Sequence, residues 1–187
     1  MNSAVIFGGC GFIGLYFAEK ALDLNLFNNL YLVDIREPED SVGKLKFKKL
    51  LDTGKVKFLK RDVRENLNDI LIEKNLTTIL NFAAIHREPG HQAYEYGETN
   101  ISGAKNVCDF AKFNNCKNII FTSSIAVYGP GEHEKNESTE ARPSTPYGKS
   151  KLEAEIVHLI WQKEDPANRI LSICRPGVVF GAGEKGN

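Results

Sequence analysis

The chain has 187 residues, of which 42% are hydrophobic and 26% charged, and it is long enough to bury one core in a single domain. Its 24 basic side chains balance its 24 acidic ones, so we expect no nucleic-acid partner. No apolar run approaches the roughly twenty residues that cross a bilayer, and no signal peptide precedes the first strand-like run. The sequence therefore predicts a cytoplasmic protein without a membrane partner.

The sulfur and imidazole side chains give no sign of a metal site. The cysteines include no C-x-x-C pair, and each lies in an apolar or helix-like context that suits a buried, reduced thiol: Cys10, Cys108, Cys116 and Cys174. The histidines lack the spacing of metal ligands, although His86 and His91 share one predicted loop. We therefore expect no metal.

In chain order, short β-rich runs alternate with longer helix-like runs, which is typical of a parallel sheet with crossover helices. The expected strands cover residues 4–7, 30–33, 56–59, 78–82, 118–122 and 169–174. The expected helices cover residues 13–24, 67–74, 94–113 and 147–162. The sequence predicts a doubly wound α/β fold.

Four further segments complete this interpretation. The basic stretches 44–49 and 55–60 are interleaved with apolar residues and read as solvated faces, and the polar, Pro-rich stretch 129–146 reads as an active-site loop. Residues 175–183 suggest a strand that runs into a glycine-rich turn. We expect a substrate domain to follow, so that residues 1–187 form the cofactor-binding domain and carry the catalytic residues. A naturally short protein is the alternative.

A glycine pattern follows the first strand directly and opens the first helix, as a dinucleotide-binding Rossmann fold requires. Gly8 permits a tight turn, Gly11 leaves room for a pyrophosphate, and Gly14 lets helix and strand pack closely. Phe12 and Ile13 belong to the same turn. The free amides at the start of the helix attract the anion.

The residue that ends the second strand indicates which dinucleotide binds. Asp34 can accept hydrogen bonds from both hydroxyls of the adenine ribose and would repel a 2′-phosphate. Ile35 and Arg36 follow it, and an arginine is the usual partner of the NADP phosphate. Because the acid comes first, at the end of the strand, we expect NAD.

Two later strand ends supply further candidates for the cofactor site. Asp62 and Val63 follow the third strand, where they either meet the adenine ring or begin a helix over residues 64–71 with Asp62 as its N-cap. The fourth strand ends in the run Phe82, Ala83 and Ala84. The two small alanines either let the backbone approach the cofactor or serve tight core packing.

A phenol and an ammonium four residues apart form the candidate catalytic pair. On a helix, Tyr147 and Lys151 share one face. A free tyrosine titrates near ~10, so it acts as a base at neutral pH only where a cation stabilises its phenolate. The run that ends at Ser124 closes a strand on the same edge of the sheet, where a hydroxyl can bond to a substrate oxygen as charge develops.

These motifs, in this order, resemble those of the extended short-chain dehydrogenases, the NAD-dependent epimerase/dehydratase group. The resemblance covers essentially the whole chain. It implies that Tyr147 is the acid and base, that Lys151 binds the nicotinamide ribose and that Ser124 polarises the reacting oxygen. It also implies that Asn100 steadies the helix after the fourth strand. By the same resemblance, two residues near the chain's end would contact the cofactor: Pro176 and Val179.

The positions after Ser124 point to the reaction. Related dehydratases carry an acidic pair there, whereas this chain has Ile125 and Ala126, so elimination lacks its general acid. The resemblance thus implies an epimerase or keto-sugar reductase acting on a nucleotide-linked sugar. The alternatives are a dehydrogenase of a small alcohol, steroid or flavonoid ketone, and a non-catalytic dinucleotide sensor. Family analogy allows a homodimer through the two long helices.

Overall fold

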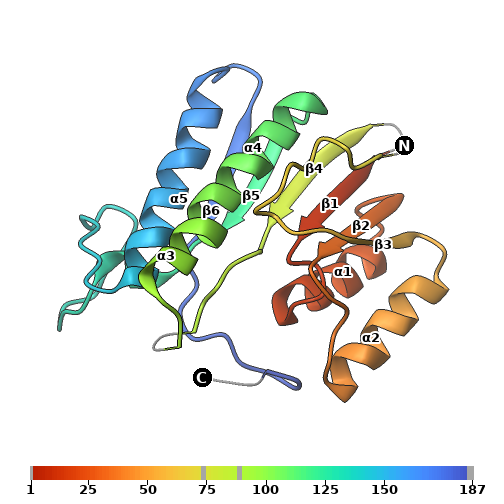
Figure 1. Cartoon of the computed structure of the whole chain (residues 1–187), viewed down its shortest axis with the longest axis horizontal. Helices are drawn as coiled ribbons and strands as arrows, with labels where there is room; N and C mark the ends of the chain where they lie inside the picture. The colour runs from red at the N-terminus through yellow and green to blue at the C-terminus, as the bar shows by residue number, and fades with distance from the viewer. Residues whose placement is uncertain (1, 73–74, 88–89, 185–187) are drawn as a thin grey trace.

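Six parallel strands form one sheet in the order β3-β2-β1-β4-β5-β6 in the computed structural model, which describes residues 2–72, 75–87 and 90–184 (Figure 1). Every neighbouring pair is parallel, and the order reverses between β1 and β4. The doubly wound α/β prediction is confirmed, and each expected strand is present. The strands are β1 (Ser3–Phe7), β2 (Asn29–Asp34), β3 (Val56–Lys60), β4 (Leu76–Asn81), β5 (Asn118–Thr122) and β6 (Ile170–Cys174).

Helices cover both faces of the sheet, in line with its two apolar cores. They are α1 (Phe12–Asp23), α2 (Ser41–Asp52), α3 (Ala93–Tyr96), α4 (Gly103–Phe113) and α5 (Pro146–Lys163). Along β1, Ala4 and Ile6 pack with residues of α1 and α2, whereas Val5 and Phe7 pack with residues of α4. Because both faces of β1 are buried, its sequence is apolar at every position after Ser3.

The long helix predicted over residues 94–113 is one helical run with a defect in it. A π-helical turn, Gly97–Ser102, joins α3 to α4. Such turns insert one extra residue and occur frequently at functional sites. Here the turn buries Asn100, whose side chain is 3% exposed, against the elements that carry the candidate site.

One helix was not predicted, and two local predictions are wrong. Residues 41–52 form α2, because Asp40 caps its first turn and Phe47 and Leu50 are buried, while Lys44, Lys48 and Lys49 are exposed as expected of a solvated face. Residues 67–72 are not helical, although Leu67 and Ile70 do enter the core, and residues 73–74 lie outside the described part. No strand follows Cys174, since residues 175–180 are irregular.

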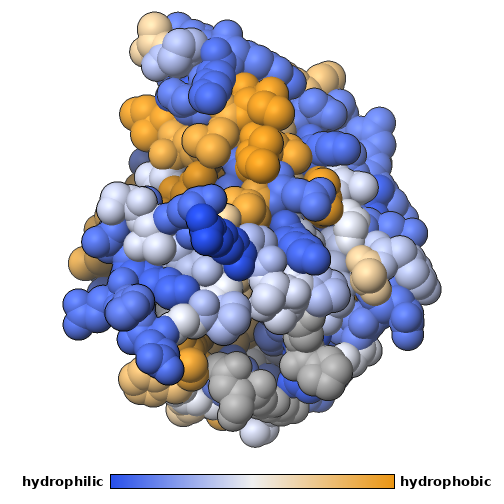
Figure 2. Space-filling view, turned by 90° about the vertical axis from the view of Figure 1, so that its left-hand side faces the viewer, coloured by the Kyte–Doolittle hydropathy of each residue, from blue (hydrophilic) through white to orange (hydrophobic). Residues whose placement is uncertain are grey.

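The outer side of β6 and the adjoining surface of α5 are apolar and exposed. Figure 2 shows this patch on the side of the molecule that carries α5. Ile160 on α5 is 55% exposed and Ile170 on β6 is 63% exposed. Cys174 is also exposed here, so the expectation of four buried thiols holds only for the other three.

Candidate active site

The candidate residues gather at the carboxyl ends of the parallel strands, where the strand order reverses. The glycine turn follows β1, Asp34 ends β2, and Ser124 follows β5. In open α/β sheets, ligands bind in the crevice at this edge. The fold therefore brings together residues that are more than a hundred positions apart in the sequence.

Backbone contacts fix the glycine turn. Gly8 has a φ of +74°, and a Cβ on it would lie 2.7 Å from the backbone nitrogen of Ala83. A Cβ on Gly14 would lie 2.5 Å from the carbonyl oxygen of Gly8. Both distances are too short for any larger residue. The chain that follows β4 thus passes directly against this turn at Ala83.

The start of α1 fits a pyrophosphate. Gly11 is its N-cap and provides no side-chain acceptor, and the first turn, which begins with Phe12 and Ile13, holds no acidic residue. A Cβ on Gly11 would meet only the carbonyl oxygen of Gly8, at 3.2 Å, so the outer side of the turn is open. Uncapped amides and the helix dipole favour an anion at this position.

Asp34 is held beside this turn. Its Oδ2 accepts a hydrogen bond from the backbone N–H of Cys10 at 3.0 Å, and its Oδ1 accepts one from Ile35 at 2.8 Å. Burial raises the pKa of the carboxyl, and these hydrogen bonds oppose that effect. Arg36 points to Glu39 instead, at 3.5 Å, and both side chains are mostly exposed. Asp34 therefore lies nearer to the dinucleotide turn than the competing arginine does.

Asp62 and Val63 occupy different environments. The carboxylate of Asp62 accepts hydrogen bonds from the backbone and guanidinium of Arg64, which lowers its pKa. No helix begins here, so the N-cap interpretation is wrong. Val63 is 7% exposed, and its carbonyl oxygen accepts a hydrogen bond from Asn106 at 2.7 Å.

The catalytic candidates from β5 and α5 are brought together by local contacts. Thr145 caps α5 by accepting a hydrogen bond from Gly148 at 3.1 Å, which places Tyr147 in the first turn. A Cβ on Gly148 would lie 2.6 Å from the carbonyl oxygen of Ala126, so α5 begins directly against the short 3₁₀ turn Ile125–Tyr128. Ser124 caps that turn, accepting from Ala126 at 3.1 Å.

Asn100 connects the segment after β4 to α5, the helix that carries Tyr147 and Lys151. Its Oδ1 accepts from the backbone of Ile85 at 2.9 Å, and its Nδ2 donates to Ser150 Oγ at 2.9 Å. Ser150 in turn donates to the carbonyl oxygen of Tyr147 at 2.8 Å. The expected steadying role thus extends to the backbone of the candidate base. Nearby, Phe82 packs edge-on against Phe17 of α1, and Ala84 is half-buried.

Lys151 is a buried cation. Its side chain is 2% exposed, and its Nζ lies 4.4 Å from the centre of the Phe121 ring. Burial lowers its pKa to about 7, and the carboxylate of Glu155 acts in the opposite direction. The charge on Lys151 is therefore sensitive to its surroundings near neutral pH.

A model of the NAD-dependent epimerase/dehydratase family matches residues 4–187. The chain belongs to this family. The resemblance drawn from the motifs is confirmed, and so is the expected cofactor, since the family is NAD-dependent. The glycine turn, the uncapped start of α1 and the carboxylate of Asp34 fit that dinucleotide.

Three relatives illustrate the range of the family. The chain is 32% identical over 188 residues, 100% of this chain and 51% of the relative, to an N-acetyl-α-D-glucosaminyl-diphospho-ditrans,octacis-undecaprenol 4-epimerase of Escherichia coli O157:H7. It is 26% identical to the decarboxylating sterol-4-alpha-carboxylate 3-dehydrogenase of Saccharomyces cerevisiae, over 99% of this chain and 53% of that protein. UDP-glucuronic acid 4-epimerase from Bacillus cereus, in complex with NAD, shares the fold with a TM-score of 0.80 at 21% identity, over 96% of this chain and 57% of that one. The chain spans about half the length of the curated relatives it matches.

The sequence interpretation missed the charged groups near Lys151 and their contacts. Glu155 lies one helical turn beyond Lys151 and is 2% exposed. Its Oε1 accepts a hydrogen bond from Arg175 Nε at 2.8 Å, and its Oε2 accepts one from Nη2 at 2.6 Å. The i, i+4 spacing of Lys151 and Glu155 is visible in the sequence and could have suggested this pair. The contact with Arg175, twenty residues on, could not.

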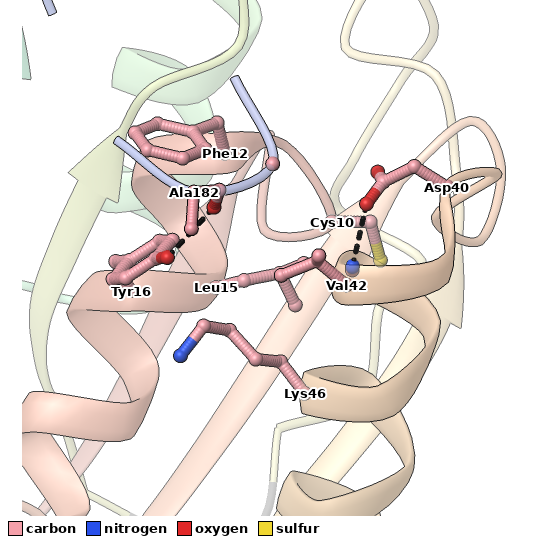
Figure 3. A pocket seen from close by; sticks show the side chains of 10 residues that line it. Cys10, Phe12, Leu15, Tyr16, Asp40, Val42, Lys46 and Ala182 are labelled. Atoms are coloured by element: carbon pink, nitrogen blue, oxygen red, sulfur yellow. Dashed lines mark hydrogen bonds between the residues drawn. The ribbon is translucent and has the colours of Figure 1, made fainter. Parts of the chain in front are cut away.

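The segment after β6 crosses the same edge of the sheet. Pro176 accepts a hydrogen bond from Ile125 N–H at 3.1 Å, and Val179 is half-buried. Further on, Tyr16 of α1 donates to the carbonyl oxygen of Ala182 at 2.8 Å (Figure 3). This contact borders a cavity of about 50 Å³ between the starts of α1 and α2, which Lys46 also lines.

Within residues 2–72, 75–87 and 90–184, no group of three or more histidine, cysteine or acidic side chains is placed to hold a metal ion. In the same residues, no helix is both long and apolar enough to cross a membrane.

Proposed function

We propose that this chain is the cofactor-binding and catalytic part of an NAD-dependent enzyme that epimerises a sugar carried on a nucleoside diphosphate. The observation that supports this most directly is the grouping of Ser124, Tyr147 and the buried Lys151 at the edge of the sheet next to the dinucleotide turn. The 32% identity to a 4-epimerase of a diphosphate-linked sugar supports the same reaction class.

Each residue has a defined task in this proposal. Tyr147, as its phenolate, accepts the proton of the sugar hydroxyl, and Ser124 donates a hydrogen bond to the oxygen as a carbonyl forms. Lys151 stabilises the phenolate by its charge. The glycine turn and Asp34 would hold NAD, whose nicotinamide would supply reversible hydride transfer to and from the sugar carbon. Tyr147 gives its proton back to the oxygen after the keto-sugar has presented its other face, so enzyme and cofactor end unchanged.

The residues after Ser124 favour epimerisation over dehydration. Ile125 is 50% exposed beside the candidate site, and Ala126 follows it. Neither can protonate a departing hydroxyl, which elimination requires. A keto-sugar reductase would use the same residues, but it would consume reduced cofactor.

A second candidate is a dehydrogenase of a sterol or another small alcohol. The 26% identity to a sterol-4-alpha-carboxylate 3-dehydrogenase over 99% of this chain favours it. The exposed apolar side chains after β6, Val178 at 72% and Phe180 at 86%, would suit an apolar substrate. Such an enzyme would turn NAD over stoichiometrically.

One experiment separates these functions. The full-length natural polypeptide is incubated with NAD and with UDP-glucose, UDP-N-acetylglucosamine, a polyprenyl-diphosphate-linked N-acetylglucosamine or a sterol. NMR follows the sugar and absorbance follows reduced cofactor. We expect a sugar epimer from a nucleotide-linked substrate without net reduced cofactor. Reduced cofactor in proportion to product would support a dehydrogenase. Turnover of the lipid-linked sugar alone would show that the sugar is carried on a polyprenyl diphosphate and not on the nucleoside diphosphate that we propose.

We also propose a homodimer through α4 and α5. Phe113 on α4 is 66% exposed, and Ile156 on α5 is 48% exposed. Light scattering on the full-length polypeptide, compared with a Phe113→Glu and Ile156→Glu variant, tests this. Equal masses for the two proteins would argue against the interface.

A further inference from the structure

Three ionisable side chains lie on the buried face of α5: Lys151 and Glu155, each 2% exposed, and His158 at 0%. Burial of unpaired charge is costly, so each of them needs compensation. His158 is compensated as a neutral ring, since burial lowers its pKa to about 4. It donates from Nδ1 to the carbonyl oxygen of Ala154 at 2.7 Å and accepts from Asn81 at 3.3 Å.

Lys151 and Glu155 remain as the charged members. The titratable groups that interact with Lys151 by charge are Glu155 and His158 on α5 and His86 in the segment after β4, and Arg175, which follows β6, binds Glu155. Within the described residues, Glu155 is the carboxylate that acts on the lysine. Its negative charge favours the charged form of Lys151, which burial opposes.

Glu155 also connects α5 to the loop of Ser124. Its two hydrogen bonds hold the guanidinium of Arg175, which donates to Tyr128 Oη at 2.8 Å and lies 4.9 Å from the centre of that ring. Tyr128 ends the short turn that Ser124 begins. At the other end of this turn, Ser123 N–H donates to the carbonyl oxygen of Cys174 at 2.7 Å. The turn is thus fixed at both ends against the exit of β6.

We infer that Glu155 is a positioning residue, which keeps Lys151 charged and, through Arg175, fixes the loop that carries Ser124. The expected effect of Glu155 on turnover rests on the proposed function. Its effect on the charge of Lys151 does not depend on the substrate. Glu155 acts through Arg175 and Lys151. A single buried carboxylate would then link the charge state of one catalytic candidate to the placement of another.

The test uses substitutions in the full-length natural polypeptide and two readouts. The first is the titration of the Lys151 side chain by NMR of its Cε, assigned by the signal that Lys151→Met loses. Glu155→Gln removes the negative charge and leaves the guanidinium, so we expect the Lys151 midpoint to move to lower pH by about one unit. Arg175→Gln leaves Glu155 without its partner, so the midpoint should move to higher pH. A purely structural role predicts no such opposite shifts.

The second readout is turnover of the nucleotide sugar with saturating NAD. We expect Glu155→Gln to lower kcat at pH 7 by about 5-fold, because a midpoint that moves down by one unit from about 7 lowers the charged fraction of Lys151 by about that factor, with KM changed far less. Glu155→Asp should recover part of the loss. The matched control is Glu164→Gln, an exposed carboxylate near the end of the same helix that pairs with Arg169 at 2.7 Å, and it should leave both readouts unchanged.

The outcomes are distinct. Unchanged Lys151 midpoints in Glu155→Gln, or shifts in the same direction in both variants, would overturn the inference, as would an equal effect of Glu164→Gln. Should either single variant fail to fold, the double variant Glu155→Gln/Arg175→Met, which removes both members of this ion pair, must still lower the midpoint, because it removes the carboxylate that acts on Lys151. If the natural protein turns over no nucleotide sugar, the proposed function fails, and the titrations decide the inference alone.

Discussion

The backbone N–H of Cys10 donates a hydrogen bond to Asp34 Oδ2 at 3.0 Å, so the carboxylate that ends β2 is fixed to the glycine turn that follows β1. This contact sets the position of the one acidic group expected at the adenine ribose. It also means that a substitution of Asp34 affects the shape of the turn as well as the contact with the ribose.

We expect Asp34→Ala to weaken NAD binding by about 10-fold or more, because a hydrogen bond to a charged group contributes ~1.5–3 kcal/mol. The wild-type preference for NAD over NADP should narrow. Asp34→Asn retains an acceptor for Cys10 and separates the loss of charge from damage to the turn. Calorimetric titration with both cofactors measures these affinities, and Asp69→Asn, an exposed acid, is the control. Tighter binding of NADP by the wild type would show that Arg36 decides the preference.

Tyr147→Phe should lower kcat by at least ~100-fold, the low end of what a positioned acid and base contributes. NAD affinity should stay nearly unchanged. Lys151→Met should reduce both, because the resemblance places the lysine at the nicotinamide ribose. Steady-state kinetics and cofactor titration measure this, with Tyr94→Phe, 65% exposed on α3, as the control. A fully active Tyr147→Phe variant would remove the phenol from the mechanism.

Gly14→Ala should destabilise the fold by about 1–3 kcal/mol, the usual cost of overpacking, and reduce NAD affinity. The reason is the 2.5 Å distance from the added Cβ to the carbonyl oxygen of Gly8. Gly97→Ala is the matched control, because nothing lies within 4 Å of its Cβ and its φ is −61°. It should be neutral or stabilising by up to about 1 kcal/mol. Urea unfolding of both variants tests the contrast, and equal effects would contradict it.

His158 should make stability fall on acidification. Its pKa is about 4 in the folded chain and near ~6.5 when unfolded, so the unfolded state binds more protons between these values. The contribution is fully present above pH ~6.5 and is lost as pH falls toward 4. Between pH 7 and pH 5 it amounts to about 2 kcal/mol.

Urea unfolding at these two pH values, in the wild type and in His158→Gln, isolates the contribution of His158. The variant should lose about 2 kcal/mol less than the wild type on acidification. His133→Gln, an exposed histidine in the loop before α5, is the control. A variant that retains the full wild-type pH dependence would show that His158 is not the group responsible.

The sheet and most of the candidate site could be predicted because both are local in sequence. Each strand is a short apolar run, and the glycines of the turn follow β1 without a gap. By contrast, α2 was missed because its four lysines conceal a narrow apolar face that includes Phe47. The helix wrongly predicted over residues 67–72 shows the opposite error, since Leu67 and Ile70 have helical spacing but enter the core from irregular backbone.

The network around Glu155 could not be predicted because its partners come from separate elements. Arg175 reaches Glu155 only because β6 lies beside β5 and ends next to α5. The contact of Asn100 with Ser150 likewise depends on how the two helices pack. Periodicity identifies which face of a helix is buried, but it does not state which polar groups meet there.

The π-helical turn at Gly97–Ser102 holds one residue more than a regular helix would over the same rotation. Removal of that one residue would let the backbone relax to a regular helix, in which Val107 and Phe110 still face the sheet. The deletion would instead change the position of Asn100, the buried member of the turn. A one-residue deletion here is therefore expected to spare the fold and to break the contacts of Asn100 with Ile85 and Ser150.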